Sequence, residues 1–397
     1  PMPFSSISRW LPLVLATLSA IGPFAIDTYL PAFPAIGAAL GATQVEVQQT
    51  LTVYMLTFAV MVMWHGSLSD RFGRRRVLIL ASGGFALAST LCALAPTIEW
   101  LWLGRAAQGM FGGAGVVVGR AVVRDLYDGA QAQRLMARVM TIFAVAPAVA
   151  PMIGGVLLEL AGWRAIFVFL ALFGGLQTWL TWRFLPESLP EDARQPLHPV
   201  GLARAYGTVL SNPAFLLLSL ATALNFNGFF LYVMSAPVFI IDHLGLGSTA
   251  FGWLFVPGVA GMMAGSMLAG RLAGRWSTGR TIAAGYGLML AAGLLNVALA
   301  ALLPAGVPQS VLPIPLFTLG MAMAMPSLSL LALDLFPARR GMASSCQSFL
   351  QMGLNAAVAG AVVPLLWGST LSLAAGMCLF AGLGLAAFLA WARRAAG

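Results

Sequence analysis

The sequence contains no lysine, and only 8% of its 397 residues are charged. Globular proteins carry about 25% charged residues, so this composition excludes a water-soluble enzyme or binding domain. Hydrophobic residues make up 60% of the chain. They gather in twelve apolar stretches of about 20 residues, a length that crosses a hydrocarbon core of roughly 30 Å as a helix. The composition predicts an all-α membrane protein with twelve transmembrane helices.

Cysteine and histidine are also scarce, with three of each. Cys92, Cys346 and Cys378 fall within predicted spans and lack the spacing of metal ligands, so we expect buried thiols and no metal site. The sequence offers no serine nucleophile, no phosphate-binding loop and no converging set of catalytic polar groups. It therefore predicts neither a cofactor nor an enzymatic activity.

All 21 basic residues are arginines, and all but Arg105 and Arg164 fall in polar gaps on one side of the predicted path. Arginine-rich loops stay in the cytoplasm, which predicts that both termini are cytoplasmic. The net charge of +9 could suggest nucleic acid. These arginines are spread over loops that face anionic lipid headgroups, however, so we expect membrane lipids and no nucleic acid as partners.

The apolar stretches divide into two sets of six around the longest polar break. The first set comprises Leu11–Pro31, Glu46–His65, Val77–Ala95, Ile98–Arg120, Met136–Leu160 and Arg164–Phe184, and the second comprises Ala214–Ile240, Ala250–Leu272, Thr281–Leu303, Gln309–Asp334, Met342–Leu366 and Ser369–Trp391. This predicts a first bundle over residues 1–184, a cytoplasmic linker over 185–213 and a second bundle over 214–397. The length of the first stretch favours a retained helix over a cleaved signal peptide.

The two halves echo each other in sequence. Placing "FAIDTYLPAFPAI" over "FLYVMSAPVFIID" aligns Phe24 with Phe230 and Pro31 with Pro237. Such repeats predict two pseudo-symmetric six-helix bundles around a central site, as in many transporters. Val233 stands opposite Asp27, so any charge chemistry is expected in the first half.

Asp27 is the only acidic residue predicted deep within a span. It lies roughly 6 Å from the outer end of the first span, and Arg105 lies roughly 10 Å from the outer end of the fourth. A carboxyl in a low-dielectric site favours its protonated form, whereas a nearby arginine favours the carboxylate. Our hypothesis is that Asp27 binds a proton and a cationic or neutral substrate alternately. Arg105 would bias which of the two states is preferred. A static ion pair, or an Asp27 that caps backbone freed by Pro31, would be structural alternatives.

The stretch "GSLSDRFGRRR" lies between the second and third spans and predicts a conformational latch. Two glycines allow a tight turn, and an acid among arginines can form charge-assisted hydrogen bonds with neighbouring helix ends. Asp125 after the fourth span is a candidate partner. The predicted latch residues are Gly66, Asp70, Arg71, Gly73, Arg74 and Asp125. The alternative is an ordinary arginine-rich loop.

Two further groups of residues are candidates for motion and for substrate contact. In the fifth span, Pro147, Pro151, Gly154 and Gly155 predict either a moving joint or a static kink. The candidate substrate contacts are polar, aromatic and methionine side chains, which can adapt to varied apolar ligands. They are Asp27, Tyr29, Tyr54, Phe58, Met61, Gln108, Asn225, Phe229 and Phe230. Packing against lipid or other helices is the alternative for each.

Several of these motifs resemble the major facilitator superfamily. "GSLSDRFGRRR", "RAAQG" from Arg105 and "APMIGG" from Ala150 are similar to its signatures, although Ala150 replaces a glycine of the broad antiporter pattern. "IDTYLPAFP", "VRDLY" and "LDLFPARRGMASS" resemble more narrowly the Bcr/CflA group of twelve-span bacterial drug:proton antiporters.

The resemblance implies a multi-pass exporter of the bacterial inner membrane that exchanges a small-molecule drug for protons by alternating access. By the same resemblance, Asp27 would be the coupling acid, Arg105 would take part in proton transfer, and Asp70, Arg74 and Asp125 would form an inner charge relay. Phenicols and bicyclomycin-like molecules are the neutral compounds that the resemblance suggests. We expect a monomer. The rival functions are a proton-coupled uptake symporter for a small metabolite, a channel, and a membrane-embedded enzyme that acts on lipid or cell-wall intermediates.

Overall fold

The computed structural model describes residues 4–127, 129–194 and 199–396. Regular structure in these ranges is helical, apart from one isolated β-bridge between Ala273 and Trp276. Eleven helical segments of the described chain are long and apolar enough to cross a membrane. The remaining predicted span corresponds to α7 (Gly129–Ala161), which contains the shorter apolar stretch Val145–Ala161. Helices suit this environment because they satisfy their own backbone hydrogen bonds in lipid.

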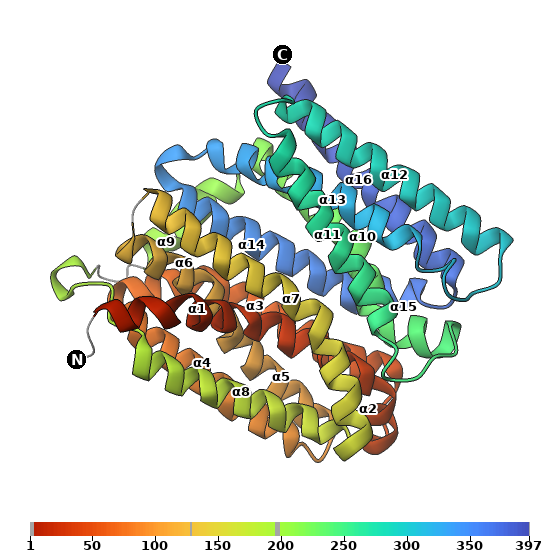
Figure 1. Ribbon diagram of the computed structural model, residues 1–397, viewed down its shortest axis with the longest axis horizontal. Coiled ribbons are helices and arrows are strands. Elements are labelled where there is room, and N and C mark those ends of the chain that lie inside the picture. Colours follow the sequence, from red (N-terminus) through yellow and green to blue (C-terminus); the bar gives the residue numbers. More distant parts are fainter. Residues whose placement is uncertain (1–3, 128, 195–198, 397) are drawn as a thin grey trace. The chain divides into compact units, whose positions relative to one another are not determined.

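The chain divides into two compact units, Pro1–Pro199 and Val200–Gly397. In the first unit, α4 packs against α8 and α5, α3 packs against α5, and α1 packs against α7 (Figure 1). The helices of this unit are α1 (Phe4–Asp27), α2 (Phe33–Leu40), α3 (Gln44–Phe72), α4 (Arg74–Ala93), α5 (Ile98–Gly112), α6 (Ala114–Leu126), α7 and α8 (Trp163–Phe184).

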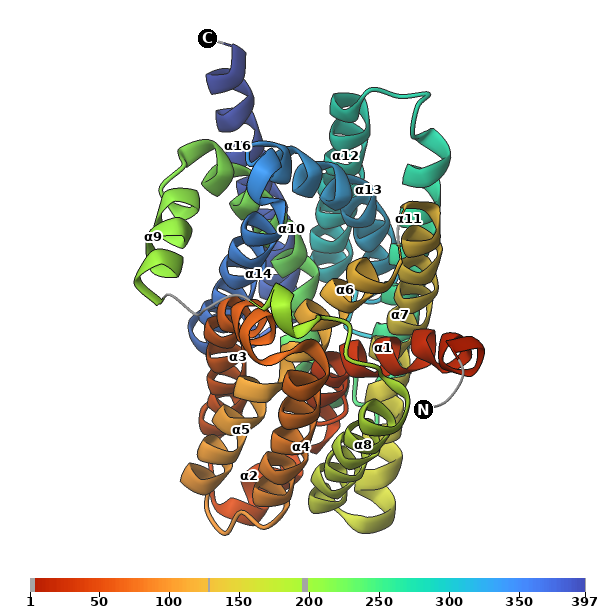
Figure 2. The same cartoon turned by 90° about the vertical axis from the view of Figure 1, so that its left-hand side faces the viewer.

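In the second unit, α10 packs against α16, α13 and α14, and α12 packs against α13 and α16 (Figure 2). Its spans are α10 (Pro213–Met234), α11 (Gly252–Leu272), α12 (Thr278–Leu302), α13 (Pro313–Asp334), the segment formed by α14 (Arg340–Ala357) and the short α15 (Val363–Leu366), and α16 (Thr370–Ala396). Short π-helical segments follow α10 at Val238–His243 and α14 at Val358–Val362. The helix α9 (Pro199–Leu210) lies within the predicted linker 185–213, where the sequence had indicated only a polar break.

Local sequence explains where several helices begin. Thr43 and Glu46 form a capping box at the start of α3, because each side chain bonds the other residue's backbone N–H. The Asn212 side chain accepts a hydrogen bond from the Phe215 N–H at the start of α10. Ser277 caps α12 in the same way.

Two predicted spans are interrupted, and both interruptions lie next to candidate site residues. The helix α1 ends at Asp27, because Pro31 has no N–H to bond the carbonyl of Asp27. A short 3-10 turn, Leu30–Ala32, then leads into α2. The fourth predicted span is split at Gly113 into α5 and α6. The first break lies where the predicted span ends at Pro31, whereas the sequence did not indicate the break at Gly113.

Candidate functional site

Asp27 lies at the C-terminal end of α1 and is only 5% exposed. Within the described chain it is the one buried acidic residue. Its carboxyl forms no ion pair and no hydrogen bond with any described residue, so the structure bears out neither structural alternative, the static ion pair or the backbone cap. The end of a helix carries partial negative charge, which gives a carboxylate no stabilisation.

Arg105 lies on α5 and is fully buried. Its Nη1 donates hydrogen bonds to the carbonyl of Ala25, at 3.0 Å, and to Oε1 of Gln108, at 2.7 Å. Ala25 is two residues before Asp27 on α1, so Arg105 reaches the same helix end without pairing with the acid. In the described part of the chain, Nε and Nη2 of Arg105 have no hydrogen-bond partner.

Two tyrosine rings cover the Arg105 guanidinium. Its central carbon is 4.7 Å from the centroid of the Tyr29 ring and 4.5 Å from that of Tyr54. The Tyr29 hydroxyl in turn bonds Thr50 Oγ1 on α3. Both tyrosines are fully buried, and so is Gln108. Three predicted substrate contacts are therefore gathered around Arg105, and their contact with substrate stays a prediction.

Gln108 is held by a residue that sequence reasoning missed. Its Nε2 donates to Ser89 Oγ at 2.7 Å, and Ser89 donates to the carbonyl of Phe85 at 2.7 Å. This chain ties Arg105 to α4. A serine within an apolar span carries no distinctive signal, since serine commonly bonds a carbonyl of its own helix.

The other substrate candidates of the first unit lie on α3. Phe58 is buried, and its ring adjoins Gly22 of α1 and Gly113. Its ring centroid lies 6.0 Å from that of Tyr54. Met61, one turn further along α3, is half-buried. Phe58 thus packs where α1, α3 and the α5–α6 junction meet.

The three candidates on α10 face different neighbours within the second unit. Asn225 is fully buried, and its Nδ2 donates to the hydroxyl of Tyr286 on α12 at 3.0 Å. Phe229 packs against Gly258 of α11. The rings of Phe230 and Phe226 lie 5.2 Å apart. Asn225 and Phe229 lie one turn apart on the same face of α10, and the contact of all three side chains with substrate stays a prediction.

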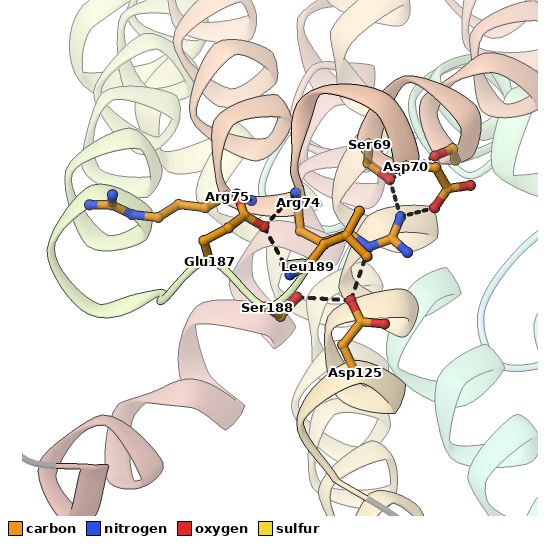
Figure 3. A network of polar contacts seen from close by, with 9 residues as sticks. Ser69, Asp70, Arg74, Arg75, Asp125, Glu187, Ser188 and Leu189 are labelled. Carbon is orange, nitrogen blue, oxygen red and sulfur yellow. Dashed lines mark hydrogen bonds and ion pairs between the residues drawn. The ribbon is translucent and has the colours of Figure 1, made fainter. Parts of the chain in front are cut away.

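The predicted latch is centred on Arg74 at the start of α4. Its Nε donates to Asp125 Oδ2 at 3.0 Å, and its Nη1 donates to Ser69 Oγ at 2.6 Å and to Asp70 (Figure 3). Ser69 and Asp70 belong to the last turns of α3, and Asp125 to the last turn of α6. One guanidinium thus joins the ends of three helices.

The turn beside the latch is tighter than the sequence had predicted. Only Gly73 separates α3 from α4, and its φ of 95° favours glycine. The carboxyl of Glu187 occupies the place that a Cβ of residue 73 would take. Gly66 lies inside α3, and an added Cβ there would meet only Val117 at an ordinary 3.7 Å, so its predicted part in the turn is wrong. Arg71 stacks its guanidinium over the ring of Phe72 at 5.2 Å.

Glu187 and Ser188, which follow α8, were missed by sequence reasoning. The Glu187 carboxylate accepts hydrogen bonds from the backbone N–H of Arg74, at 2.8 Å, and of Arg75, at 3.3 Å (Figure 3). Ser188 Oγ donates to Asp125 Oδ2 at 2.9 Å. A signal for this contact exists: α4 begins with three arginines and has no side-chain cap of its own. The positive end of a helix normally attracts acids, so an acid from elsewhere is needed.

The predicted joint in the fifth span lies in α7, which contains Pro147 and Pro151. Gly154 and Gly155 are buried. A Cβ added at Gly154 would collide with the backbone carbonyl of Thr28. The proline–glycine segment of α7 therefore lies against Thr28, the residue that follows Asp27.

Comparison with known proteins decides the family. Residues 15–360 match the Major Facilitator Superfamily. The chain belongs to this superfamily. It is 36% identical to the uncharacterized MFS-type transporter YdgK of Bacillus subtilis, over 66% of each chain. It is 31% identical to a bicyclomycin resistance protein homolog of Haemophilus influenzae, over 65% of each. Both matches span slightly less than two thirds of the relative's length.

A solved structure supports the same fold. A bacterial homolog of the human lysosomal transporter Spinster matches with a TM-score of 0.72 at 16% sequence identity, covering 99% of this chain and 98% of that one. The chain is thus a multi-pass membrane protein with the fold of this superfamily.

Proposed function

We propose that this transporter exports drugs across the bacterial inner membrane in exchange for protons, with both termini in the cytoplasm. The observation that carries the proposal is Asp27, a buried acid at a broken helix end that has no partner among the described residues. An acid without a fixed partner can change its protonation state at lower cost than one in an ion pair. The similarity to a bicyclomycin resistance protein homolog supports a drug as the cargo.

The proposed mechanism is competition for Asp27. Substrate entering from the cytoplasm displaces the proton, and the loaded transporter then exposes its site to the outside. A proton that returns to Asp27 from outside releases the drug and resets the cycle. Moving one charge through about 100 mV supplies roughly 2.3 kcal/mol, which sustains a roughly fifty-fold gradient of a neutral drug.

The latch would control the conformational step of this cycle. Arg74 joins the ends of α3, α4 and α6, so the ion pairs with Asp70 and Asp125 have to hold or yield together. Charge-assisted hydrogen bonds of this kind are stronger than neutral ones and suit a reversible closure. The proline and glycine residues of α7 would let the end of α1 shift against that helix.

The test uses inverted membrane vesicles with an imposed proton gradient and a panel of bicyclomycin and phenicols. We expect gradient-driven drug accumulation for the unchanged protein, none for Asp27→Asn, and normal accumulation for Asp192→Asn, an exposed control acid. An uncoupler should abolish accumulation, whereas ATP depletion at constant gradient should not. Transport in the opposite direction would favour the uptake symporter, and retained accumulation by Asp27→Asn would refute the proton exchange.

A further inference from the structure

The fully buried guanidinium of Arg105 lacks the counter-ion that its position demands. Taking an isolated charge out of water costs several kcal/mol unless other groups compensate. The two hydrogen bonds of Nη1 go to a neutral carbonyl and a neutral amide, and no acidic side chain of the described chain pairs with Arg105. Some other group must therefore stabilise this cation.

The rings of Tyr29 and Tyr54 supply that stabilisation. Each presents its face to the guanidinium, at centroid distances of 4.7 and 4.5 Å. The face of an aromatic ring is electron-rich, and a cation–π contact is worth about 2 kcal/mol or more when it is desolvated. Tyr29 follows α1 and Tyr54 lies on α3, so two separate elements enclose the cation.

The surroundings of the two rings differ in a way that a test can use. The Tyr29 hydroxyl bonds Thr50 Oγ1, which itself donates to the carbonyl of Val47 at 2.6 Å. The Tyr54 hydroxyl has no partner in the described part of the chain. On α5, Gly109 packs against the backbone carbonyl of Tyr54, and Gly112 packs against the hydroxyl end of its ring. Packing thus fixes the Tyr54 ring, and its hydroxyl contributes no hydrogen bond.

We infer that Tyr29 and Tyr54 are positioning residues for proton coupling, which replace a counter-ion for Arg105 and so keep its charge beside the end of α1 without an ion pair to Asp27. An ion pair would favour the carboxylate and oppose its protonation. Aromatic rings stabilise the cation and, unlike an acidic counter-ion, do not compete with Asp27 for the proton. The inference rests on the proposed proton exchange. The titratable side chains that interact with Arg105 are the two tyrosines and Cys92 of α4, and Asp27 interacts with Tyr54.

The test compares ring-retaining and ring-removing variants at each tyrosine. Tyr54→Phe keeps the ring face, and Tyr54→Met keeps much of the volume without it. In inverted vesicles with an imposed gradient and bicyclomycin as probe, we expect Tyr54→Phe to stay within about twofold of the unchanged protein. Tyr54→Met should lose about tenfold or more, the equivalent of one desolvated cation–π contact. The pH at which the efflux of Tyr54→Met is half-maximal should also differ from that of the unchanged protein. At position 29 as well, Tyr29→Phe should retain more efflux than Tyr29→Met.

A variant that lacks the Arg105 charge distinguishes a role of Tyr54 in stabilising the cation from a role in packing. In Arg105→Met, the additional change Tyr54→Met should cause no further loss of thermal stability in detergent, because the ring then has no charge to stabilise. If Tyr54→Met alone fails to accumulate in the membrane, the double variant should restore accumulation. A double variant that still fails to accumulate would assign the ring to packing and overturn the inference.

Further outcomes distinguish this inference from the proposed function. Phe variants as impaired as the Met variants would mean that the hydroxyls matter, which contradicts the inference. Met variants that export normally, while Asp27→Asn is inactive, would also overturn it and leave the proton exchange intact. Export by Asp27→Asn would instead refute the proton exchange itself, whatever the tyrosine variants do.

Discussion

Gly154 of α7 packs directly against the backbone carbonyl of Thr28, the residue that follows Asp27. The absence of a side chain at Gly154 lets α7 lie against the broken end of α1. This contact joins two motifs that are far apart in the sequence, the acid of the first span and the proline–glycine segment of the fifth.

We therefore expect Gly154→Ala to displace the end of α1. The added methyl meets backbone, which cannot move aside as a flexible side chain could, and overpacking of this kind costs about 1–3 kcal/mol. Gly175→Ala on α8 is the matched control, because a Cβ there has open space. The measurement is the thermal unfolding temperature in detergent together with drug efflux. Equal behaviour of the two variants would show that the close contact has no influence.

A second prediction concerns the acid that caps α4. Glu187→Gln removes the charge that faces the N-terminal end of this helix and its three arginines. We expect the free energy of unfolding to fall by about 1 kcal/mol. Because the same helix end carries Arg74, the latch should weaken and drug efflux should fall about fivefold.

Glu191→Gln is the control for this prediction, since Glu191 is 88% exposed and only pairs with Arg194 at 3.3 Å. Cysteine labelling of the buried residue Val77→Cys in the first turn of α4 would report whether the helix ends separate more readily. Faster labelling is expected in Glu187→Gln and not in Glu191→Gln. Identical labelling rates would contradict a role for Glu187 in the latch.

The third prediction tests a buried amide pair in the second unit. Asn227 Nδ2 on α10 donates to Asn355 Oδ1 on α14 at 2.8 Å. Asn227→Leu alone leaves the Asn355 amide without this partner, which should cost about 1–3 kcal/mol. The double variant Asn227→Leu/Asn355→Leu should be more stable than either single variant, measured as thermal unfolding in detergent. A double variant with the summed loss of both single changes would show that the two amides are not coupled.

Much of the fold could be predicted from the sequence, because apolar length defines a membrane helix. Pro31 also marked the place where α1 breaks, and "GSLSDRFGRRR" indicated a polar cluster between α3 and α4. The sequence could not show that α3 continues to Phe72, since polar residues beyond the apolar stretch still form helix. Nor could it show α9, a short helix within a polar segment.

The site was harder to predict, for a physical reason. Depth along a helix follows from counting residues, and this placed Asp27 and Arg105 at similar levels. The direction in which a side chain leaves its helix does not follow from its depth. That direction decides which side chains come into contact. The guanidinium consequently lies against Tyr29 and Tyr54 and bonds Ala25 rather than Asp27. Glu187 was missed because its partner, Arg74, lies far from it in the sequence.

The central claim is that drug and proton compete for Asp27, and proton release on drug binding tests it most directly. Purified protein in weakly buffered detergent would be mixed with bicyclomycin or a phenicol that the unchanged protein exports, while pH and drug binding are recorded together. The account predicts about one proton released per drug bound by the unchanged protein, and none from Asp27→Asn. Equal release from both proteins, or drug binding by the unchanged protein without any release, would contradict it.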